Sequence, residues 1–212
     1  MLPTAELVAN MKQWRQSLDK EDRWCILINA DPDALASALA LRRILLPRVH
    51  NADIARVNEV TRPDNLAMIR YLRIPVRMWQ AEKADQYNRF AIVDSQPHHH
   101  KAFHGVVFDC VIDHHPLPSG TDESPYSSDA YCDIRPGLGA TSTMMTRYMQ
   151  GLRMRPGPRL ATALLYGIRT DTGAFERSGD EDDFRAYQWL SRHADNNLLR
   201  RIVRSEYLRD WL

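Results

Sequence analysis

Cysteine is scarce in this chain of 212 residues, since Cys25, Cys110 and Cys132 are the only three and they form no Cys-X-X-Cys pair. Their number and spacing argue against a disulfide framework or a structural zinc site and favour a reducing compartment. No hydrophobic run approaches the roughly 18 residues that a membrane span needs. The N-terminal segment, with Glu6 in its apolar stretch, lacks a signal-peptide layout. These absences predict a cytoplasmic protein with no membrane partner.

A net charge of one sign is also missing, because the formal charge is only +1. No bulk field therefore argues for nucleic-acid or membrane binding. The charged residues are nevertheless biased in type, with 24 Arg against 4 Lys and 19 Asp against 8 Glu. Arginine suits phosphate and carboxylate recognition, and aspartate suits loops, caps and metal sites.

Short apolar runs alternate with helical patterns in the first two thirds of the chain. The predicted strands are 24–28, 52–57, 76–79, 89–93 and 106–112, and the predicted helices among them are 3–18, 33–46 and 64–72. Near-continuously apolar strands that alternate with helices predict an α/β fold, a doubly wound and mainly parallel sheet with helices on both faces. After Pro136 the pattern predicts a helical C-terminal part, with helices at 140–152, 158–170, 182–193 and 197–212.

Acidic residues follow several of the predicted strands directly. Asp31 and Asp33 follow the first strand, Asp94 follows the run 89–93, and Asp113-His114-His115 follows the run 106–112. Asp171 lies beside a glycine where a helix is predicted to end. In an open α/β sheet, ligands gather at the carboxyl ends of the strands. Any one of these aspartates is explained by a helix cap or a turn, but the set together favours a shared site for Mn²⁺, or alternatively Mg²⁺.

These motifs, in this order, resemble the DHH phosphoesterase family over about residues 23–175. The matching segments are Asp31-Pro32-Asp33-Ala34-Leu35-Ala36-Ser37, Val93-Asp94-Ser95, Asp113-His114-His115 and Thr170-Asp171-Thr172-Gly173, with Gly137-Leu138-Gly139-Ala140-Thr141-Ser142 before the last. Members of that family include nanoRNases that also hydrolyse 3′-phosphoadenosine 5′-phosphate, RecJ-type exonucleases and family II inorganic pyrophosphatases. The resemblance implies a single DHH domain over 1–212, with C-terminal helices over 176–212.

The resemblance also implies roles for individual residues. Asp33, Asp94, His114 and Asp171 would hold one Mn²⁺, and Asp31 would hold a second ion that Asp94 bridges. His115 would face the scissile phosphate as a catalytic residue. The segment with Gly139, Thr141 and Ser142 would bind substrate, because backbone amides at a helix N-terminus form a phosphate cradle.

Two departures from the family pattern bear on function. Many relatives carry a metal-ligating His where this chain has Leu27, which leaves Asn29 as a weak substitute ligand, so one or two ions are expected. The further substrate-binding domain of many relatives is expected to be absent, so the substrate is small or a second subunit, from a homo-oligomer or another protein, closes the cleft.

Two functional hypotheses follow. The first is a Mn²⁺-dependent phosphoesterase that cleaves short oligonucleotides or nucleotide bisphosphates by two-metal-assisted water attack. The second is a catalytically impaired DHH domain that binds a metal or nucleotide as a regulatory or scaffold subunit. The run His98-His99-His100 predicts a solvated loop beside the cleft, with phosphate contact as the alternative.

Overall fold

Six strands form one sheet in the computed structural model, which describes residues 4–117, 126–177 and 179–205. The strands are β1 (Arg23–Ile28), β2 (Asn51–Arg56), β3 (Val76–Met78), β4 (Arg89–Val93), β5 (Phe108–Asp113) and β6 (Tyr126–Ile134). They lie in the order β3-β2-β1-β4-β5-β6, and every neighbouring pair is parallel. The predicted parallel α/β sheet is confirmed.

The strand order contains a topological switch point between β1 and β4. From β1 the chain continues to β2 on one side, whereas from β4 it continues to β5 on the other. In such sheets the loops at the carboxyl ends of the two central strands diverge and leave a crevice between them. The segments that follow β1 and β4 are those that carry Asp31, Asp33 and Asp94.

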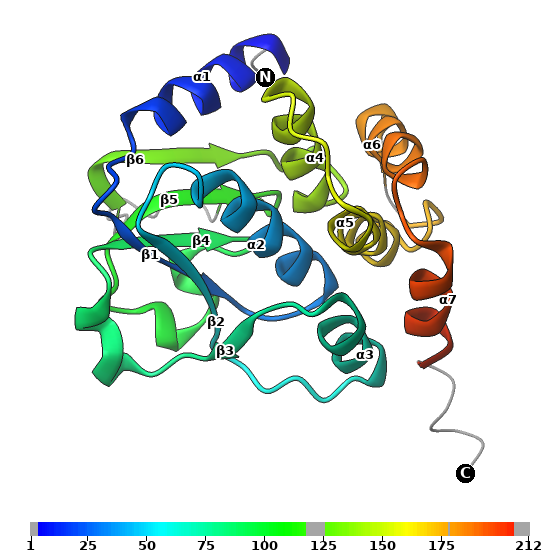
Figure 1. Ribbon diagram of the computed structural model, residues 1–212, viewed down its shortest axis with the longest axis horizontal. Helices are drawn as coiled ribbons and strands as arrows, with labels where there is room; N and C mark the ends of the chain where they lie inside the picture. The colour runs from blue at the N-terminus through cyan, green and yellow to red at the C-terminus, as the bar shows by residue number, and fades with distance from the viewer. Residues whose placement is uncertain (1–3, 118–125, 178, 206–212) are drawn as a thin grey trace.

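The two faces of the sheet are covered differently. All seven described α-helices contribute to one apolar core: α1 (Thr4–Ser17), α2 (Pro32–Leu45), α3 (Pro63–Leu72), α4 (Thr141–Gly151), α5 (Pro158–Asp171), α6 (Glu181–Ser191) and α7 (Asn196–Ser205). Alternate strand residues such as Ile26 and Val93 point into this core. In Figure 1 the strands run toward the side where α4 and α5 lie.

The opposite face carries a smaller apolar cluster. Cys25, Leu27, Ile92 and Val111 form it together with Phe103. Three short 3-10 helices lie in the connections on either side of β4, namely η1 (Ala81–Gln86), η2 (Pro97–His99) and η3 (Lys101–Phe103). The second helical layer expected from the sequence is therefore built, in the described residues, from 3-10 turns rather than α-helices.

Strand β6 and part of α7 differ from the sequence expectation. The β6 segment, Tyr-Ser-Ser-Asp-Ala-Tyr-Cys-Asp-Ile, has no apolar run and was not predicted as a strand. It lies at the edge of the sheet, where most of its side chains are only half-buried or exposed, so it needs no apolar run. The predicted helix 197–212 begins at Asn196, and its residues 206–212 lie outside the described part of the chain.

Candidate metal centre

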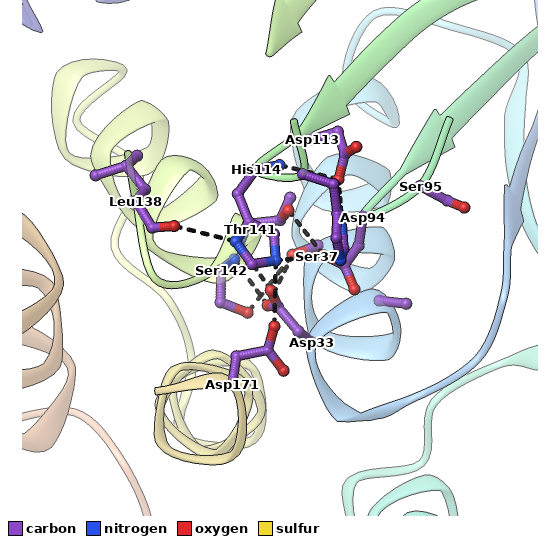
Figure 2. A network of polar contacts seen from close by, with 12 residues as sticks. Asp33, Ser37, Asp94, Ser95, Asp113, His114, Leu138, Thr141, Ser142 and Asp171 are labelled. Atoms are coloured by element: carbon purple, nitrogen blue, oxygen red, sulfur yellow. Dashed lines mark hydrogen bonds and ion pairs between the residues drawn. The ribbon is translucent and has the colours of Figure 1, made fainter. Parts of the chain in front are cut away.

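Four of the predicted ligands meet at the carboxyl end of the sheet. Ligand atoms of Asp33, Asp94, His114 and Asp171 all lie within 4.8 Å of one another. They come from the first turn of α2, the end of β4, the end of β5 and the last residue of α5. Figure 2 shows these four side chains pointing toward one another. Residues up to 138 positions apart in the chain thus form one polar cluster.

Asp33 is fully buried and bound by the N-terminus of α4. Its Oδ2 accepts a hydrogen bond from the Thr141 amide at 2.6 Å, and its Oδ1 accepts one from the Ser142 amide at 2.8 Å. The Ser37 hydroxyl lies 3.4 Å from the same Oδ1. A helix N-terminus carries free amides and a partial positive charge, so it stabilises a carboxylate there. Asp33 is therefore held in place without any ion.

Asp94 is buried and has an unusual backbone conformation. Its φ of 57° lies in the left-handed region, which non-glycine residues rarely adopt, although Asp tolerates it better than most. The Asp94 amide still donates to the Ile112 carbonyl at 2.9 Å, and the Thr141 hydroxyl donates to Asp94 Oδ1 at 2.9 Å. The turn begins immediately after β4 and points the carboxylate back over the ends of the strands. Such outliers are concentrated at functional sites.

His114 supplies the one nitrogen in the cluster. Its Nδ1 donates to the Leu138 carbonyl at 3.1 Å, because a carbonyl oxygen can only accept. Its Nε2 is buried, lies 3.2 Å from Asp171 Oδ2 and 3.5 Å from Asp94 Oδ1, and makes no well-directed hydrogen bond to any described residue. A ring whose Nδ1 is bound to a backbone carbonyl presents Nε2 as a metal ligand.

His115 is half-exposed, and a hydrogen bond to Asp113 fixes the orientation of its ring. The His115 Nδ1 donates to Asp113 Oδ1 at 2.8 Å. Asp113 is fully buried, and its carboxylate also accepts from the side-chain amide of Gln96 at 2.7 Å and from the His114 amide at 2.9 Å. Nδ1 of His115 is therefore occupied, and Nε2 is the nitrogen left for a substrate. Asp113 and Gln96 were not among the predicted site residues.

Comparisons with known proteins agree with this geometry. A family model described as the DHH family, N-terminal domain, matches residues 24–168. The chain belongs to the DHH family. The match ends three residues before Asp171, whose place in the cluster comes from the structure.

Two relatives of this DHH domain are considerably longer than the chain itself. It is 35% identical over 179 residues to an uncharacterized protein of Methanocaldococcus jannaschii, covering 84% of this chain and 36% of that protein. It is similar in fold to an exopolyphosphatase-related protein from Bacteroides fragilis, with a TM-score of 0.69 and 18% identity, covering 96% of this chain and 60% of that one. Within the described residues, no helix has the length and apolar character to cross a bilayer.

The electrostatics of the DHH site favour a bound cation. Burial, followed by the charge of Asp171, raises the pKa of Asp33 to about 6. Burial, followed by the charges of Asp33 and Asp31, raises the pKa of Asp94 well above its usual range. Burial disfavours charge on His114, but the adjacent carboxylates of Asp171 and Asp33 outweigh it and raise its pKa to about 9. Raised pKa values at the carboxylates and at the imidazole together indicate a site short of positive charge.

The donor set fits a divalent cation. Three carboxylates and one imidazole, with no thiolate, are typical ligands of Mn²⁺ and related ions. The buried Nε2 of His114, without a well-directed hydrogen bond, provides an independent indication, because buried polar atoms are normally satisfied. Asp33, Asp94, His114 and Asp171 are therefore the residues that would hold one ion.

Asp31 and Asn29 do not join the four-residue cluster. Asp31 caps α2, with its Oδ1 accepting from the Ala34 amide at 2.8 Å. Burial, followed on the raising side by the charge of Asp33, raises the pKa of Asp31 to about 6. Asn29 is exposed, and Leu27 is fully buried in the apolar cluster on the other face of the sheet. The second ion expected from the family pattern is thus left with Asp31 and Asp94 as its well-placed charged ligands.

The amides predicted as a phosphate cradle are occupied by protein carboxylates. Gly139 donates to Asp183 Oδ2 at 2.8 Å, and the Thr141 and Ser142 amides donate to Asp33. A Cβ at Gly139 would lie 2.8 Å from both Asp183 Oδ2 and Thr172 Cγ2, so glycine is needed for this close approach. As a correction to the sequence analysis, these three amides bind the carboxylates of Asp33 and Asp183 and are not free to receive a phosphate.

Proposed function

We propose that this DHH domain is a divalent-metal-dependent phosphoesterase, with Mn²⁺ as the preferred ion. The observation that carries the proposal is the buried Nε2 of His114 among the carboxylates of Asp33, Asp94 and Asp171. Membership of the DHH family supports phosphoesterase chemistry in general. The structural neighbour named as exopolyphosphatase-related adds phosphoanhydrides to the substrates worth testing, beside short oligonucleotides and nucleotide bisphosphates.

The residues of the site have two roles in this proposal, holding the ion and donating a proton. A divalent ion, when bound, supplies positive charge that neutralises the carboxylates and activates water at neutral pH. Asp33 is fixed by α4, and His114 is fixed by the Leu138 carbonyl, so the ligands need little rearrangement to receive it. Hydrogen bonding to Asp113 raises the pKa of His115, which keeps a proton on the ring and leaves Nε2–H for transfer to the leaving oxygen.

Activity against a small substrate panel tests this proposal. The protein is incubated with Mn²⁺ and dinucleotides, 3′-phosphoadenosine 5′-phosphate, pyrophosphate or short polyphosphate. We expect His114→Ala and Asp171→Ala to lower turnover at least a hundredfold, because each removes a ligand of the ion. His104→Ala, which changes an exposed histidine outside the cluster, is the matched control. No turnover above the His114→Ala level on any substrate would reject the proposal.

A second candidate function is metal or nucleotide binding without catalysis. The observation that favours it is the burial of Leu27 in the opposite apolar cluster, which leaves the second ion poorly held. Metal content by mass spectrometry and binding of a nucleotide bisphosphate by calorimetry separate the two candidates. Binding of both without turnover would favour the regulatory role. Turnover by the natural chain would exclude it.

A further inference from the structure

One histidine outside the metal centre lies against the predicted catalytic histidine. The ring of His99 packs edge-on against that of His115, with centroids 5.4 Å apart and an interplanar angle of 83°. Ligand atoms of His99, His115 and Asp113 all lie within 4.8 Å of one another. Ligand atoms of His115, Asp94 and His114 also lie within 4.8 Å of one another. His99 therefore lies beside His115 and Asp113 but outside the group that His115 forms with Asp94 and His114.

The hydrogen bonds of His99 determine its tautomer. The Gln96 amide donates to His99 Nδ1 at 3.1 Å, and the Ser95 hydroxyl lies 3.3 Å from the same nitrogen. A nitrogen that accepts from an amide carries no proton, so the proton of the neutral ring is on Nε2. The side chain is exposed, and its Nε2 has no partner among the described residues. His99 thus presents a fixed, solvent-accessible N–H donor beside His115.

A single buried residue holds both imidazoles. Gln96 is fully buried, and its backbone amide binds His99 while its side-chain amide donates to Asp113 and to the His115 carbonyl, at 2.7 and 3.0 Å. Asp113 in turn orients His115. The other two histidines of the run are held differently, since the His98 ring has no hydrogen-bond partner among the described residues and His100 caps η3 through its own Nδ1. Only His99 is preorganised beside the site.

We propose that Nε2–H of His99 binds a second phosphoryl group, adjacent to the one that meets His115 and the metal centre. A neutral N–H donor fits a phosphate oxygen and adds no charge that would compete with the ion. The inference rests on the proposed function and narrows its substrate class to compounds that carry two or more phosphoryl groups close together. A simple monophosphate ester would not use His99.

Binding of two inorganic probes tests this assignment without turnover. The Mn²⁺-loaded protein is titrated by calorimetry with imidodiphosphate, a diphosphate analogue, and with inorganic phosphate. His99→Asn removes the Nε2–H donor, while the Asn Oδ1 takes the place of Nδ1 as acceptor for the Gln96 amide. We expect this variant to bind imidodiphosphate about tenfold more weakly, the effect of one lost hydrogen bond to a charged group, and inorganic phosphate within twofold of wild type. His104→Asn, at an exposed histidine of the same loop region that does not contact His99, is the matched control with no change.

Each other outcome is decisive as well. Equal weakening of both probes, or weakening of neither, overturns the role of His99 and leaves the phosphoesterase proposal standing. A lower Mn²⁺ content or melting temperature in His99→Asn shows that His99 only braces the Ser95–Gln96 loop, and this also overturns the inference. Failure of the wild-type protein to bind either probe overturns the inference and the proposed function together.

Discussion

The metal-free protein is expected to lose stability as the pH rises from about 4.5 to 7. Asp33 is fully buried, and its pKa is raised from near 3.8 to about 6. In this window the folded state keeps a proton that the unfolded state has released. The unfolding free energy therefore falls as the pH rises through the folded pKa, and the decrease is complete above it.

The size of the effect follows from the shift at Asp33. The pKa of Asp33 is about two pH units higher in the folded protein than in the unfolded chain. At 1.36 kcal/mol for each pH unit, this lowers the unfolding free energy by about 3 kcal/mol once the proton is lost. Asp31 and Asp94 have raised pKa values too and act in the same direction, but their charges are coupled to Asp33, so we take about 3 kcal/mol as the expected scale for the group. The raised pKa of His114 extends the loss, because its stabilisation is present below 6.5 and disappears as the pH rises through about 9.

With Mn²⁺ bound, the unfolding free energy is expected to increase as the pH rises. The ion needs deprotonated ligands, so its contribution to stability grows as protons leave the site. Urea unfolding at a series of pH values, with chelator or with Mn²⁺, measures both curves. Asp85→Asn, at an exposed aspartate outside the site, should leave both slopes unchanged. A metal-free protein whose stability is flat or rises between pH 4.5 and 7 would refute the reasoning.

Three further predictions concern single residues. Asp171→Asn should lower the pKa of His114 in the metal-free protein, measured by NMR titration of the imidazole, because Asp171 is the largest contribution that raises it. Gly139→Ala should destabilise the fold by about 1–3 kcal/mol in urea unfolding, through the Cβ contacts with Asp183 and Thr172, whereas Gly157→Ala, which meets no atom within 4 Å, should not. Thr141→Val should lower the unfolding free energy by about 1 kcal/mol through loss of the bond to Asp94, and no change would show that this bond is not stabilising.

The interior of the fold was predictable from the sequence because its strands are buried on both faces. Buried parallel strands need near-continuous apolar runs, and β1 and β4 have them. Strand β6 was not predicted, because an edge strand is partly exposed to solvent and its polar sequence is typical of a loop. The 3-10 helices that cover the second face of the sheet were not predicted either, because short 3-10 turns such as η3 have no α-helical periodicity to detect.

The four residues of the polar cluster were predicted to lie together because motif order and strand ends both indicated them. The residues that were missed position His115 or the segment before α4 through hydrogen bonds, and no spacing rule indicates such bonds. Asp113 lies in a motif that sequence reasoning had already found, and its place two residues before His115 on an extended segment was the available signal. Gln96 and Asp183 gave no comparable signal, because their partners are brought to them by the tertiary fold.

The misassigned helix N-terminus explains how so many carboxylates can fold together before an ion arrives. Like charges in a buried site repel, and each must be compensated or protonated. Asp33 is compensated by the amides of α4, Asp94 receives the Thr141 hydroxyl, and Asp171 lies beside the proton of His114. These hydrogen bonds hold the carboxylates in place, so we expect ion binding to exchange protons for metal charge with little rearrangement of the site. The same amides are not free for a phosphate, so under the proposed function the phosphate contacts would come from elsewhere at this edge of the sheet, where His115 and His99 lie.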